Sequence, residues 1–347
     1  PPSQVPVSWA TEDACNTTVQ WGSSPTALSN TAVGTSNTYS VLFYKSPYLH
    51  NAVMTGLEPA TTVYYRVGDA SRGFSPVLNF TTAQLASSFP QRFFLIADHG
   101  HTTDESVVTT SRMVSSLNAN PFDALILAGD LSYADGAGKT WDLYMNQIQP
   151  LASRVPFLTT VGNHEMVIVD GVVLPNLKSY TNRFLMPSPS PLPSPLPERT
   201  LFWSANVGSL HTIALNSENI TDFGPGTPMY EWLDTDLTAA NANRAAVPWI
   251  MCFWHRPIYS SDHTHGNDTT MRDQLEPLLL KHRVNFVHSG HVHAYERSNP
   301  MANGVVAPPG THGIVYFTNG MAGNGEGLYK SFVDPRPPMS AFRLADY

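Results

Sequence analysis

The spacing of apolar positions divides the chain into two regions with different patterns. Up to about residue 82, apolar and polar residues alternate in short runs such as Val5–Trp9 and Thr17–Trp21, with turn residues between them. Alternation with a period of two is typical of strands that bury one face. We therefore expect an all-β domain over residues 1–84.

The segment Leu57–Val67 gives a more specific signal within this first region. A Leu-x-Pro loop precedes a tyrosine-rich strand. This arrangement resembles the tyrosine corner of fibronectin type III sandwiches, in which a Tyr hydroxyl ties the strand to the preceding loop. Only five or six strands can be counted, whereas such a sandwich has about seven. We therefore expect its first strand to be absent from this chain and the domain to act as a structural spacer.

Beyond residue 91 the pattern changes to apolar runs separated by helical spacing. Continuous apolar runs predict strands covered on both faces, over 92–97, 123–128 and 156–161. Helical spacing over 106–118 and 141–151 lies between them. This βαβαβ order predicts a largely parallel sheet. The second region is thus expected to be an α/β domain over residues 85–347, with mixed sheets flanked by helices.

The remainder of this region continues the alternation of strands and helices. We expect a hairpin over 201–216, helices over 228–241 and 270–282, and strands over 247–254, 286–292 and 313–319. The proline-rich segment 187–197 is typical of a polyproline-II loop or an SH3-type ligand. Inside a folded domain, a loop insertion is the favoured interpretation.

Composition excludes several classes of partner. The 347 residues carry a formal net charge of −8, so the chain lacks the basic surface that nucleic-acid binding needs. No apolar run reaches the ~18 residues of a membrane span. Charged residues make up only 13% of the chain, about half the usual share. The surface therefore needs another source of solubility.

Four N-x-[ST] sequons offer that source. Their acceptors are Asn16, Asn79, Asn219 and Asn267. We expect a secreted glycoprotein, extracellular, at the cell surface or vacuolar, whose signal peptide was removed or whose N-terminus was trimmed. The two cysteines, Cys15 and Cys252, are predicted to be free, and a bridge between them is the less favoured alternative.

Polar residues recur where the predicted strands of the second region end. They occur as Asp98-His99-Gly100, Gly129-Asp130-Leu131-Ser132-Tyr133, Gly162-Asn163-His164-Glu165, His255, and Gly290-His291-Val292-His293. The carboxyl ends of parallel strands converge on one crevice. Each motif alone is explained as a helix cap, a turn or a chance histidine pair. Together, these oxygen and nitrogen donors predict a site for two ions such as Fe, Zn or Mn, suited to displacement at phosphorus.

The series of motifs resembles the calcineurin-type metallophosphoesterases. Tyr133, three residues after Asp130, narrows the resemblance to the purple acid phosphatases. The likeness extends over nearly the whole chain, including the β domain and the segments Tyr230–Leu233 and His293–Ser298. Relatives continue beyond the segment resembling Ala341–Tyr347, so we expect the catalytic domain to be incomplete at its C-terminus.

The resemblance implies a set of seven metal ligands. The first ion, expected to be Fe(III), would be held by Asp98, Tyr133 and His293. The second, expected to be Fe(II), Zn or Mn, would be held by Asn163, His255 and His291, and Asp130 would bridge the two. A hard phenolate suits Fe(III), and neutral donors suit a divalent ion. A metal-bound hydroxide would attack phosphorus without a covalent phosphoenzyme.

Other histidines are assigned with less support from the motifs. His164 resembles the residue that orients the phosphate, and the leaving-group acid is either His265, which is marginally favoured, or His263. His99 and His101 are weakly expected to line the rim of the site. Glu165 is expected to support its loop. The remaining histidines are interpreted as structural or surface residues: His50, His211, His282, His288 and His312.

These features predict a secreted binuclear acid phosphatase that hydrolyses phosphate monoesters. The nearest alternative is a phosphodiesterase or nucleotide pyrophosphatase on the same scaffold, because metal motifs do not fix the substrate. A non-catalytic surface or matrix glycoprotein that reuses the fold is the alternative from another class. The expected partner is a small phosphate ester. A homodimer or a larger extracellular assembly is left open.

Overall fold

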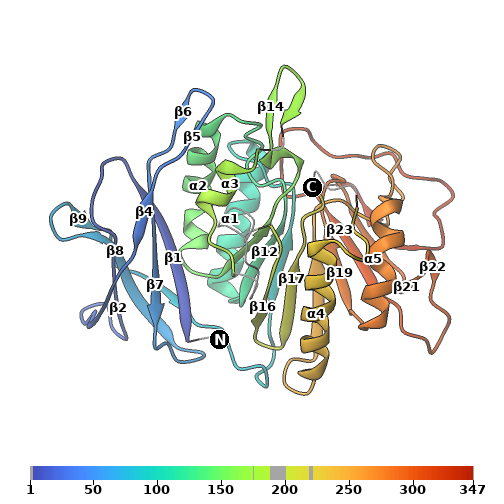
Figure 1. Ribbon diagram of the computed structural model, residues 1–347, viewed down its shortest axis with the longest axis horizontal. Helices are drawn as coiled ribbons and strands as arrows, with labels where there is room; N and C mark the ends of the chain where they lie inside the picture. Colours follow the sequence, from blue (N-terminus) through green and yellow to red (C-terminus); the bar gives the residue numbers. More distant parts are fainter. Residues whose placement is uncertain (1–2, 175, 188–200, 219–221, 347) are drawn as a thin grey trace.

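The computed structural model describes residues 3–174, 176–187, 201–218 and 222–346 (Figure 1). Its N-terminal part contains two antiparallel sheets of short strands. One has the order β1 (Gln4–Thr11), β7 (Tyr48–Thr55), β4 (Thr35–Asn37). The other has the order β10 (Leu78–Thr81), β8 (Thr62–Asp69), β2 (Thr18–Gly22), β3 (Asn30–Val33), and β9 (Gly73–Phe74) pairs with β8. Alternate residues of both sheets form one apolar core that includes Trp21, Met54 and Tyr65.

Two expectations for this domain were wrong. The two sheets hold three and five strands, more than the five or six that the sequence suggested. The strands that were missed, such as β4 with its three exposed residues, are too short to show a periodic pattern. The expected tyrosine corner is also not formed by Tyr65. The Tyr65 hydroxyl donates to the carbonyl of Ser153 at 2.7 Å, 88 residues further along the chain, and not to the preceding loop.

The second part of the chain begins with a parallel sheet of three strands. Its order is β11 (Phe93–Ile96), β12 (Ala124–Ala128), β13 (Phe157–Thr160), as the apolar runs predicted. Helices α1 (Asp104–Ala119) and α2 (Gly138–Ala152) connect the strands and pack on one face. Thr103 caps α1, since its side chain accepts a hydrogen bond from the amide of Ser106.

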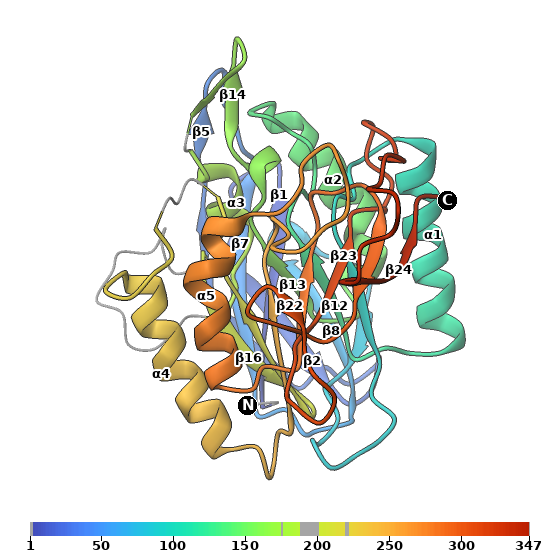
Figure 2. The same cartoon turned by 90° about the vertical axis from the view of Figure 1, so that its right-hand side faces the viewer.

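A seven-stranded mixed sheet faces the first one. Its order is β16 (Trp203–Val207), β17 (Leu210–Ala214), β18 (Trp249–Phe253), β19 (Phe286–Ser289), β23 (Val315–Asn319), β20 (Tyr295–Ser298), β24 (Ser340–Leu344). Helices α4 (Pro228–Ala242) and α5 (Thr269–Lys281) cover its outer face. Figures 1 and 2 show the resulting layers of helices, two sheets and helices. Apolar side chains such as Ile126, Trp203 and Phe253 fill the space between the sheets.

Short elements lie mainly in the loops between these layers. They are β5 (Ser40–Val41), β6 (Tyr44–Lys45), the 3-10 turn η1 (Asn163–Glu165), β14 (Val167–Val169), β15 (Val172–Leu174), α3 (Lys178–Arg183), β21 (Met301–Ala302) and β22 (Val305–Val306). None is long enough to show a periodic signal, and the sequence analysis missed all of them. The predicted proline-rich loop lies, apart from Pro187, outside the described residues.

Arg183 links the β domain to the α/β domain through buried polar contacts. Its guanidinium donates to the hydroxyls of Tyr39 at 2.9 Å and Tyr44 at 2.7 Å, and to Asp142 at 2.8 Å. The Tyr44 hydroxyl also donates to Asp142 at 2.9 Å. Because the arginine side chain is only 3% exposed, removal of its charge leaves this cluster uncompensated in the interior.

The Arg183→Met variant is expected to lose about 2 kcal/mol of unfolding free energy, because a buried charged group loses its hydrogen bonds to Tyr39, Tyr44 and the partly exposed Asp142. Urea denaturation measures this loss. Arg72→Met is the matched control, since its pair with Asp13 is largely exposed and contributes less than about 1 kcal/mol. Equal losses in the two variants would contradict a stabilising role for the Arg183 cluster.

His288, on β19, introduces a pH dependence of stability. Burial lowers its pKa to about 4, and its Nε2 lies 3.0 Å from the Ile96 carbonyl. Its Nδ1 has no hydrogen-bond partner among the described residues. The folded protein therefore holds this histidine neutral, whereas the unfolded chain protonates it near pH 6.5.

Stability is accordingly expected to fall as the pH drops from 6.5 to about 4. Below that window the loss is complete, and it amounts to up to about 3 kcal/mol for this one group. Urea unfolding at pH 7.5 and pH 4.5 measures the effect. His288→Gln, which keeps a donor but does not titrate, should reduce the difference between the two pH values. If the stability of His288→Gln differs between the two pH values as much as that of the wild type, other groups cause the pH dependence.

Candidate metal centre

The predicted ligands all follow strand ends at one edge of the two facing sheets. Asp98 follows β11, Asp130 and Tyr133 follow β12, and Asn163 begins the turn after β13. The mixed sheet supplies the others: His255 follows β18, and His291 and His293 follow β19. The structure brings all seven side chains to this edge in two groups that lie close together.

The first group surrounds the hydroxyl of Tyr133. That oxygen lies 3.2 Å from Oδ1 of Asp98 and 3.1 Å from Nε2 of His293. The same His293 nitrogen is 3.3 Å from Oδ1 of Asp98. Burial, and after it the negative charges of Asp98 and Asp130, raise the pKa of Tyr133 well above its usual value. A phenolate therefore forms here only if a cation binds beside it.

The second group surrounds Nε2 of His255. This atom lies 3.0 Å from Oδ2 of Asp130, 3.1 Å from Oδ1 of Asn163 and 3.2 Å from Nδ1 of His291. Donor atoms of Asp130, His255 and His291 lie within 4.8 Å of one another, a geometry that could hold a metal ion. Asp130 thus belongs to this group, and its charge also acts on Tyr133 of the first.

The hydrogen bonds of the ligand histidines orient their free nitrogens inward. Nδ1 of His255 lies 2.9 Å from the Ala128 carbonyl, and Nδ1 of His293 lies 2.9 Å from that of Gly327. A carbonyl only accepts, so both Nδ1 atoms carry hydrogen and each Nε2 can direct a lone pair at the neighbouring ligand oxygens. Such hydrogen bonds fix the tautomer of metal-bound histidines.

The charges of this pocket favour a bound cation. Although burial opposes protonation, the carboxylates of Asp130 and Asp98 raise the pKa of His255 to about 10. Burial likewise opposes ionisation of Asp130, but His255 and His164 hold its pKa well below its usual range. Both pKa shifts show that the buried carboxylates stabilise positive charge beside them. Metal ions would supply such charge. The donor set therefore fits two ions.

Glycines next to the ligands leave no room for side chains. A Cβ atom on Gly290 would lie 2.3 Å from Oδ2 of Asp98, and one on Gly162 would lie 2.5 Å from Oδ1 of Asp130. Gly129, with a φ of +83°, would place its Cβ 2.8 Å from Nδ1 of His255. The glycines of the sequence motifs thus allow the backbone to approach the ligand carboxylates and imidazole closely.

Four ligands themselves have left-handed backbone conformations. Their φ values are +58° at Asp98, +53° at Asp130, +55° at Tyr133 and +69° at His291. This region is unfavourable for residues with a Cβ, and such strain concentrates at functional sites. The sharp turn after each strand is what directs these side chains toward a common centre.

Glu165 connects the loop that carries Asp130 with the loop that carries Asn163. Its carboxylate accepts hydrogen bonds from the amides of Asp130 at 2.8 Å, Leu131 at 2.9 Å and Gly162 at 2.8 Å. Burial, and after it the charge of Asp130, raise its pKa to about 8. All of these contacts are to backbone, so Glu165 supports the loops, as the sequence suggested.

His164 projects beside the ligands with one nitrogen already engaged. Its Nδ1 lies 2.7 Å from Asp135, and its ring stacks on Tyr133 with centroids 4.1 Å apart. Although burial opposes protonation, the bond with Asp135 and the charge of Asp130 raise its pKa to about 9. His164 is thus a cation whose Nε2 remains directed toward the site, 4.0 Å from Asp130.

The side chain of His265 lies next to the proposed metal ligand His291. Its ring centroid is 4.1 Å from that of His291 and 5.2 Å from that of Tyr329. Asp262 holds this turn, because its Oδ1 accepts from the amides of Thr264 and His265 at 2.7 and 3.1 Å. Both histidines are exposed, but the bond described for His263, to Ser331, uses only its backbone. The geometry therefore favours His265 of the two candidates.

The expectation that His99 lines the rim was wrong. The side chain is fully buried and turns inward, with Nε2 3.1 Å from the hydroxyl of Thr110 and 3.3 Å from the carbonyl of Ser106. Burial lowers its pKa to about 4. His101 is partly buried, and its Nδ1 lies 3.1 Å from the Ser132 carbonyl.

Three residues near the site were not found by sequence reasoning. Tyr329 stacks on His293 with centroids 4.3 Å apart, and Asp135 pairs with His164. Glu326 lies 3.6 Å from His164 and 3.8 Å from His293. All three come from loops without periodic pattern. The only available signal for Glu326 and Tyr329 was the glycine-rich run 323–327, which ends close to Tyr329.

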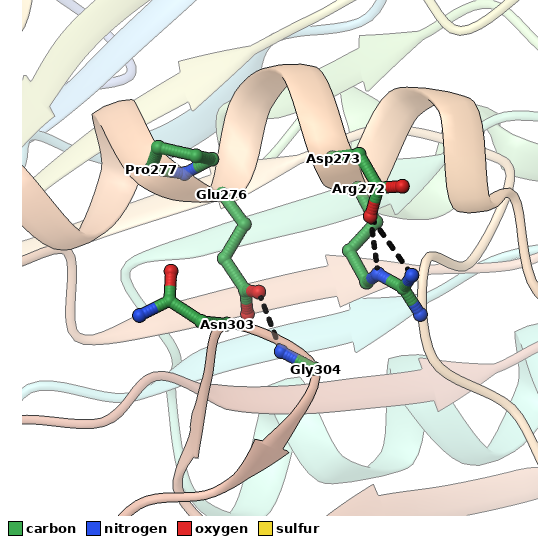
Figure 3. A pocket seen from close by; sticks show the side chains of 6 residues that line it. All are labelled: Arg272, Asp273, Glu276, Pro277, Asn303 and Gly304. Atoms are coloured by element: carbon green, nitrogen blue, oxygen red, sulfur yellow. Dashed lines mark hydrogen bonds and ion pairs between the residues drawn. The ribbon is translucent and has the colours of Figure 1, made fainter.

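A pocket elsewhere on the surface is unrelated to this centre. It is formed by α5 and the β21–β22 hairpin and is lined by Arg272, Asp273, Glu276, Pro277, Asn303 and Gly304 (Figure 3). The Glu276 carboxylate accepts hydrogen bonds from the hydroxyls of Tyr259 and Tyr316 and from the amide of Gly304, at 2.9, 3.0 and 3.2 Å. Its charge is thus used to hold the hairpin against the helix.

The structure shows the exposure of the predicted glycan acceptors and the state of the two cysteines. Three of the four sequon asparagines, Asn16, Asn79 and Asn267, are exposed, and Asn219 lies outside the described residues. Both cysteines are free, and Cys252 is buried, as predicted. Among the described helices, none has the length and apolar character that a membrane crossing requires.

Comparison with known proteins identifies the class to which this fold and centre belong. Residues 91–295 match the profile of the calcineurin-like phosphoesterases. Residues 1–82 match the purple acid phosphatase N-terminal domain, and residues 313–347 match the iron/zinc purple acid phosphatase-like protein C profile. The chain is a metallophosphoesterase by fold.

Individual relatives define the family more narrowly. Purple acid phosphatase 22 of Arabidopsis thaliana is 36% identical over 98% of this chain and 74% of its own length. Phosphoenolpyruvate phosphatase of Allium cepa is 32% identical over 98% of this chain and 71% of its own. The purple acid phosphatase PPD1 of yellow lupin, at 23% identity, shares the fold with a TM-score of 0.84 over 100% of this chain and 67% of its own. The chain belongs to the purple acid phosphatases.

Proposed function

We propose that this chain is a binuclear metal-dependent acid phosphatase that hydrolyses phosphate monoesters. The observation that carries the proposal is the convergence of two donor groups, one around Tyr133 and one around His255, next to the carboxylate of Asp130. Two ions side by side at such an edge are suited to in-line displacement at phosphorus.

The chemistry of the donors supports a division of the two ions. Asp98, Tyr133 and His293 would hold Fe(III), since a phenolate is a hard anionic ligand. Asn163, His255 and His291 would hold a divalent ion, Fe, Zn or Mn, with Asp130 shared between both. One relative, 31% identical over 98% of this chain, is named Fe(3+)-Zn(2+) purple acid phosphatase 12. When bound, the ions supply positive charge that stabilises the reacting phosphoryl group and acidifies water.

Two histidines of the chain would handle the phosphate itself. His164 is cationic, and its bond to Asp135 leaves the hydrogen on Nε2 free to bind a phosphate oxygen. His265, beside His291, would donate a proton to the departing alcohol oxygen. His263 is the less favoured acid, because its described bond uses only backbone, whereas the ring of His265 contacts that of His291.

The proposed acid supports activity at low pH. Burial lowers the pKa of His265 below the ordinary histidine value, against the opposing effect of Asp262. The fraction of His265 that carries a transferable proton therefore rises as the pH falls below about 6.5. This direction favours an acidic optimum for kcat.

The sequons and the low charge content support secretion as a glycoprotein, through a signal peptide that is later removed. The exposed positions of Asn16, Asn79 and Asn267 leave room for glycans. Residues 1–84 would form the supporting β-sandwich domain and residues 85–347 the catalytic domain, joined by the buried Arg183 cluster.

The deciding experiment combines metal analysis of the purified protein with a substrate panel at pH 5. The panel contains p-nitrophenyl phosphate, phosphoenolpyruvate, phytate, ATP and bis-p-nitrophenyl phosphate. Preference for monoesters is expected, and preference for the diester or ATP would favour the phosphodiesterase or pyrophosphatase alternative. A fully metal-loaded protein that hydrolyses none of them would favour a non-catalytic glycoprotein.

A further inference from the structure

Glu326 places a carboxylate at the mouth of the metal centre. Its Oε1 lies 3.6 Å from Nε2 of His164, and its Oε2 lies 3.8 Å from Nε2 of His293. The side chain is 46% exposed, so it borders solvent on one side and the two ligand groups on the other. It contacts the histidine nitrogen that an incoming phosphate would use.

The loop that carries Glu326 is fixed to the centre on both sides. The amide of Glu326 donates to Oδ1 of Asn324 at 2.9 Å, and the Asn324 side chain donates to the carbonyl of Asp98 at 3.1 Å. On the other side, the Gly327 carbonyl lies 2.9 Å from Nδ1 of His293. The backbone is thus anchored to two proposed ligands of the first group, whereas the carboxylate accepts only a long hydrogen bond, from the hydroxyl of Tyr329 at 3.5 Å, among the described residues.

His164 has no second donor to offer. Asp135 occupies Nδ1, so Nε2 is the only ring nitrogen of His164 directed into the site. Glu326 and a substrate phosphate therefore compete for the position next to the same nitrogen. Because the Glu326 carboxylate is half-exposed, its ion pair with His164 contributes little free energy, and phosphate can displace it. Its negative charge nevertheless repels a phosphate dianion bound nearby.

We propose that Glu326 is a specificity-determining residue that weakens the binding of phosphate at the metal centre. Its carboxylate takes the position of a phosphate oxygen next to His164, and incoming phosphate must displace it. The consequence is faster release of inorganic phosphate, the product, at the expense of a higher KM. This inference rests on the proposed phosphatase function, because it concerns the same site.

The test compares the metal-loaded wild type with Glu326→Gln, which keeps the size of the side chain and removes its charge. Inorganic phosphate is the probe, by calorimetric titration and as an inhibitor of p-nitrophenyl phosphate hydrolysis. We expect phosphate to bind the variant about threefold to tenfold more tightly, with KM lowered and kcat not increased. The difference should shrink in 0.5 M salt, because a half-exposed charge is screened.

Two further variants make the result specific to this position. Glu12→Gln, an exposed residue in the β domain, makes the same chemical change away from the site and should leave phosphate affinity unaltered. Glu326→Asp keeps the charge but shortens the arm, and it should fall between the wild type and Glu326→Gln. Metal content, measured for every variant, should match that of the wild type.

The outcomes separate this inference from the function on which it rests. Unchanged phosphate affinity in an active Glu326→Gln enzyme would overturn the inference alone. Weaker phosphate binding, or loss of metal, would also overturn it, because Glu326 would then assist binding or ligate an ion. Absence of both hydrolysis and phosphate binding in wild type and variant would refute the phosphatase proposal, and this inference with it.

Discussion

An Asp130→Ala variant is expected to lose phosphatase activity by on the order of 10³-fold or more, together with most of its bound metal. Asp130 is 1% exposed, and its Oδ2 lies 3.0 Å from His255. As the proposed bridging ligand, it contributes to both ions at once. Its Oδ1 also accepts from the amide of His164 at 2.9 Å, so the histidine proposed to orient the phosphate loses an anchor as well.

Activity alone does not distinguish loss of the site from loss of the fold. Asp130→Asn, which keeps the shape and tolerates the φ of +53°, should retain the cooperative unfolding of the apoprotein but not its metals. Asp13→Asn is the matched control, because Asp13 is exposed and pairs only with Arg72 at the surface. Metal analysis and p-nitrophenyl phosphate turnover give the readouts. A metal-loaded, active Asp130→Asn enzyme would remove Asp130 from the bridge.

A Tyr133→Phe variant is expected to lose all visible charge-transfer absorption while it keeps its divalent ion. The Tyr133 hydroxyl is the only phenolic oxygen placed in the proposed ligand groups, 3.1 Å from His293. Phenylalanine retains the aromatic stack on His164, so the loss is confined to one donor atom. Without its phenolate, the first ion is also expected to bind more weakly.

The visible spectrum and metal content of the purified protein measure this effect. Tyr329→Phe serves as the matched control, because Tyr329 stacks on His293 but its hydroxyl is directed at Glu326, at 3.5 Å. The control should keep its colour. A visible band that survives in Tyr133→Phe would assign the chromophore to a different group.

That the proposed ligands lie together could be predicted from the sequence, because each of them follows a strand end. The apolar runs before Asp98, Asp130 and Asn163 are long enough to identify their strands, and parallel strands bring their ends to one edge. The helices α1, α2, α4 and α5 were likewise identified by their spacing. For these elements, local pattern and tertiary structure agree.

The features that could not be predicted from the sequence depend on contacts between segments that are distant along the chain. The Tyr65 hydroxyl bonds to Ser153 in the other domain, although its local motif suggested a bond within its own loop. His99 turns into the core because Thr110 of α1 offers a buried partner. Glu326 reaches His164 across more than 160 positions in the chain, from a loop without periodicity. No local pattern encodes such contacts.

The left-handed backbone at Asp98, Asp130, Tyr133 and His291 has a consequence for the evolution of this chain. Each of these conformations costs on the order of 1 kcal/mol relative to glycine. Glycine at these positions would relieve this strain, but at Asp98 and Asp130 it would also remove the hydrogen bonds accepted from the amides of His291 and His164. In chains of this fold that do not use the site, we therefore expect Tyr133 and His291 to diverge before the two aspartates.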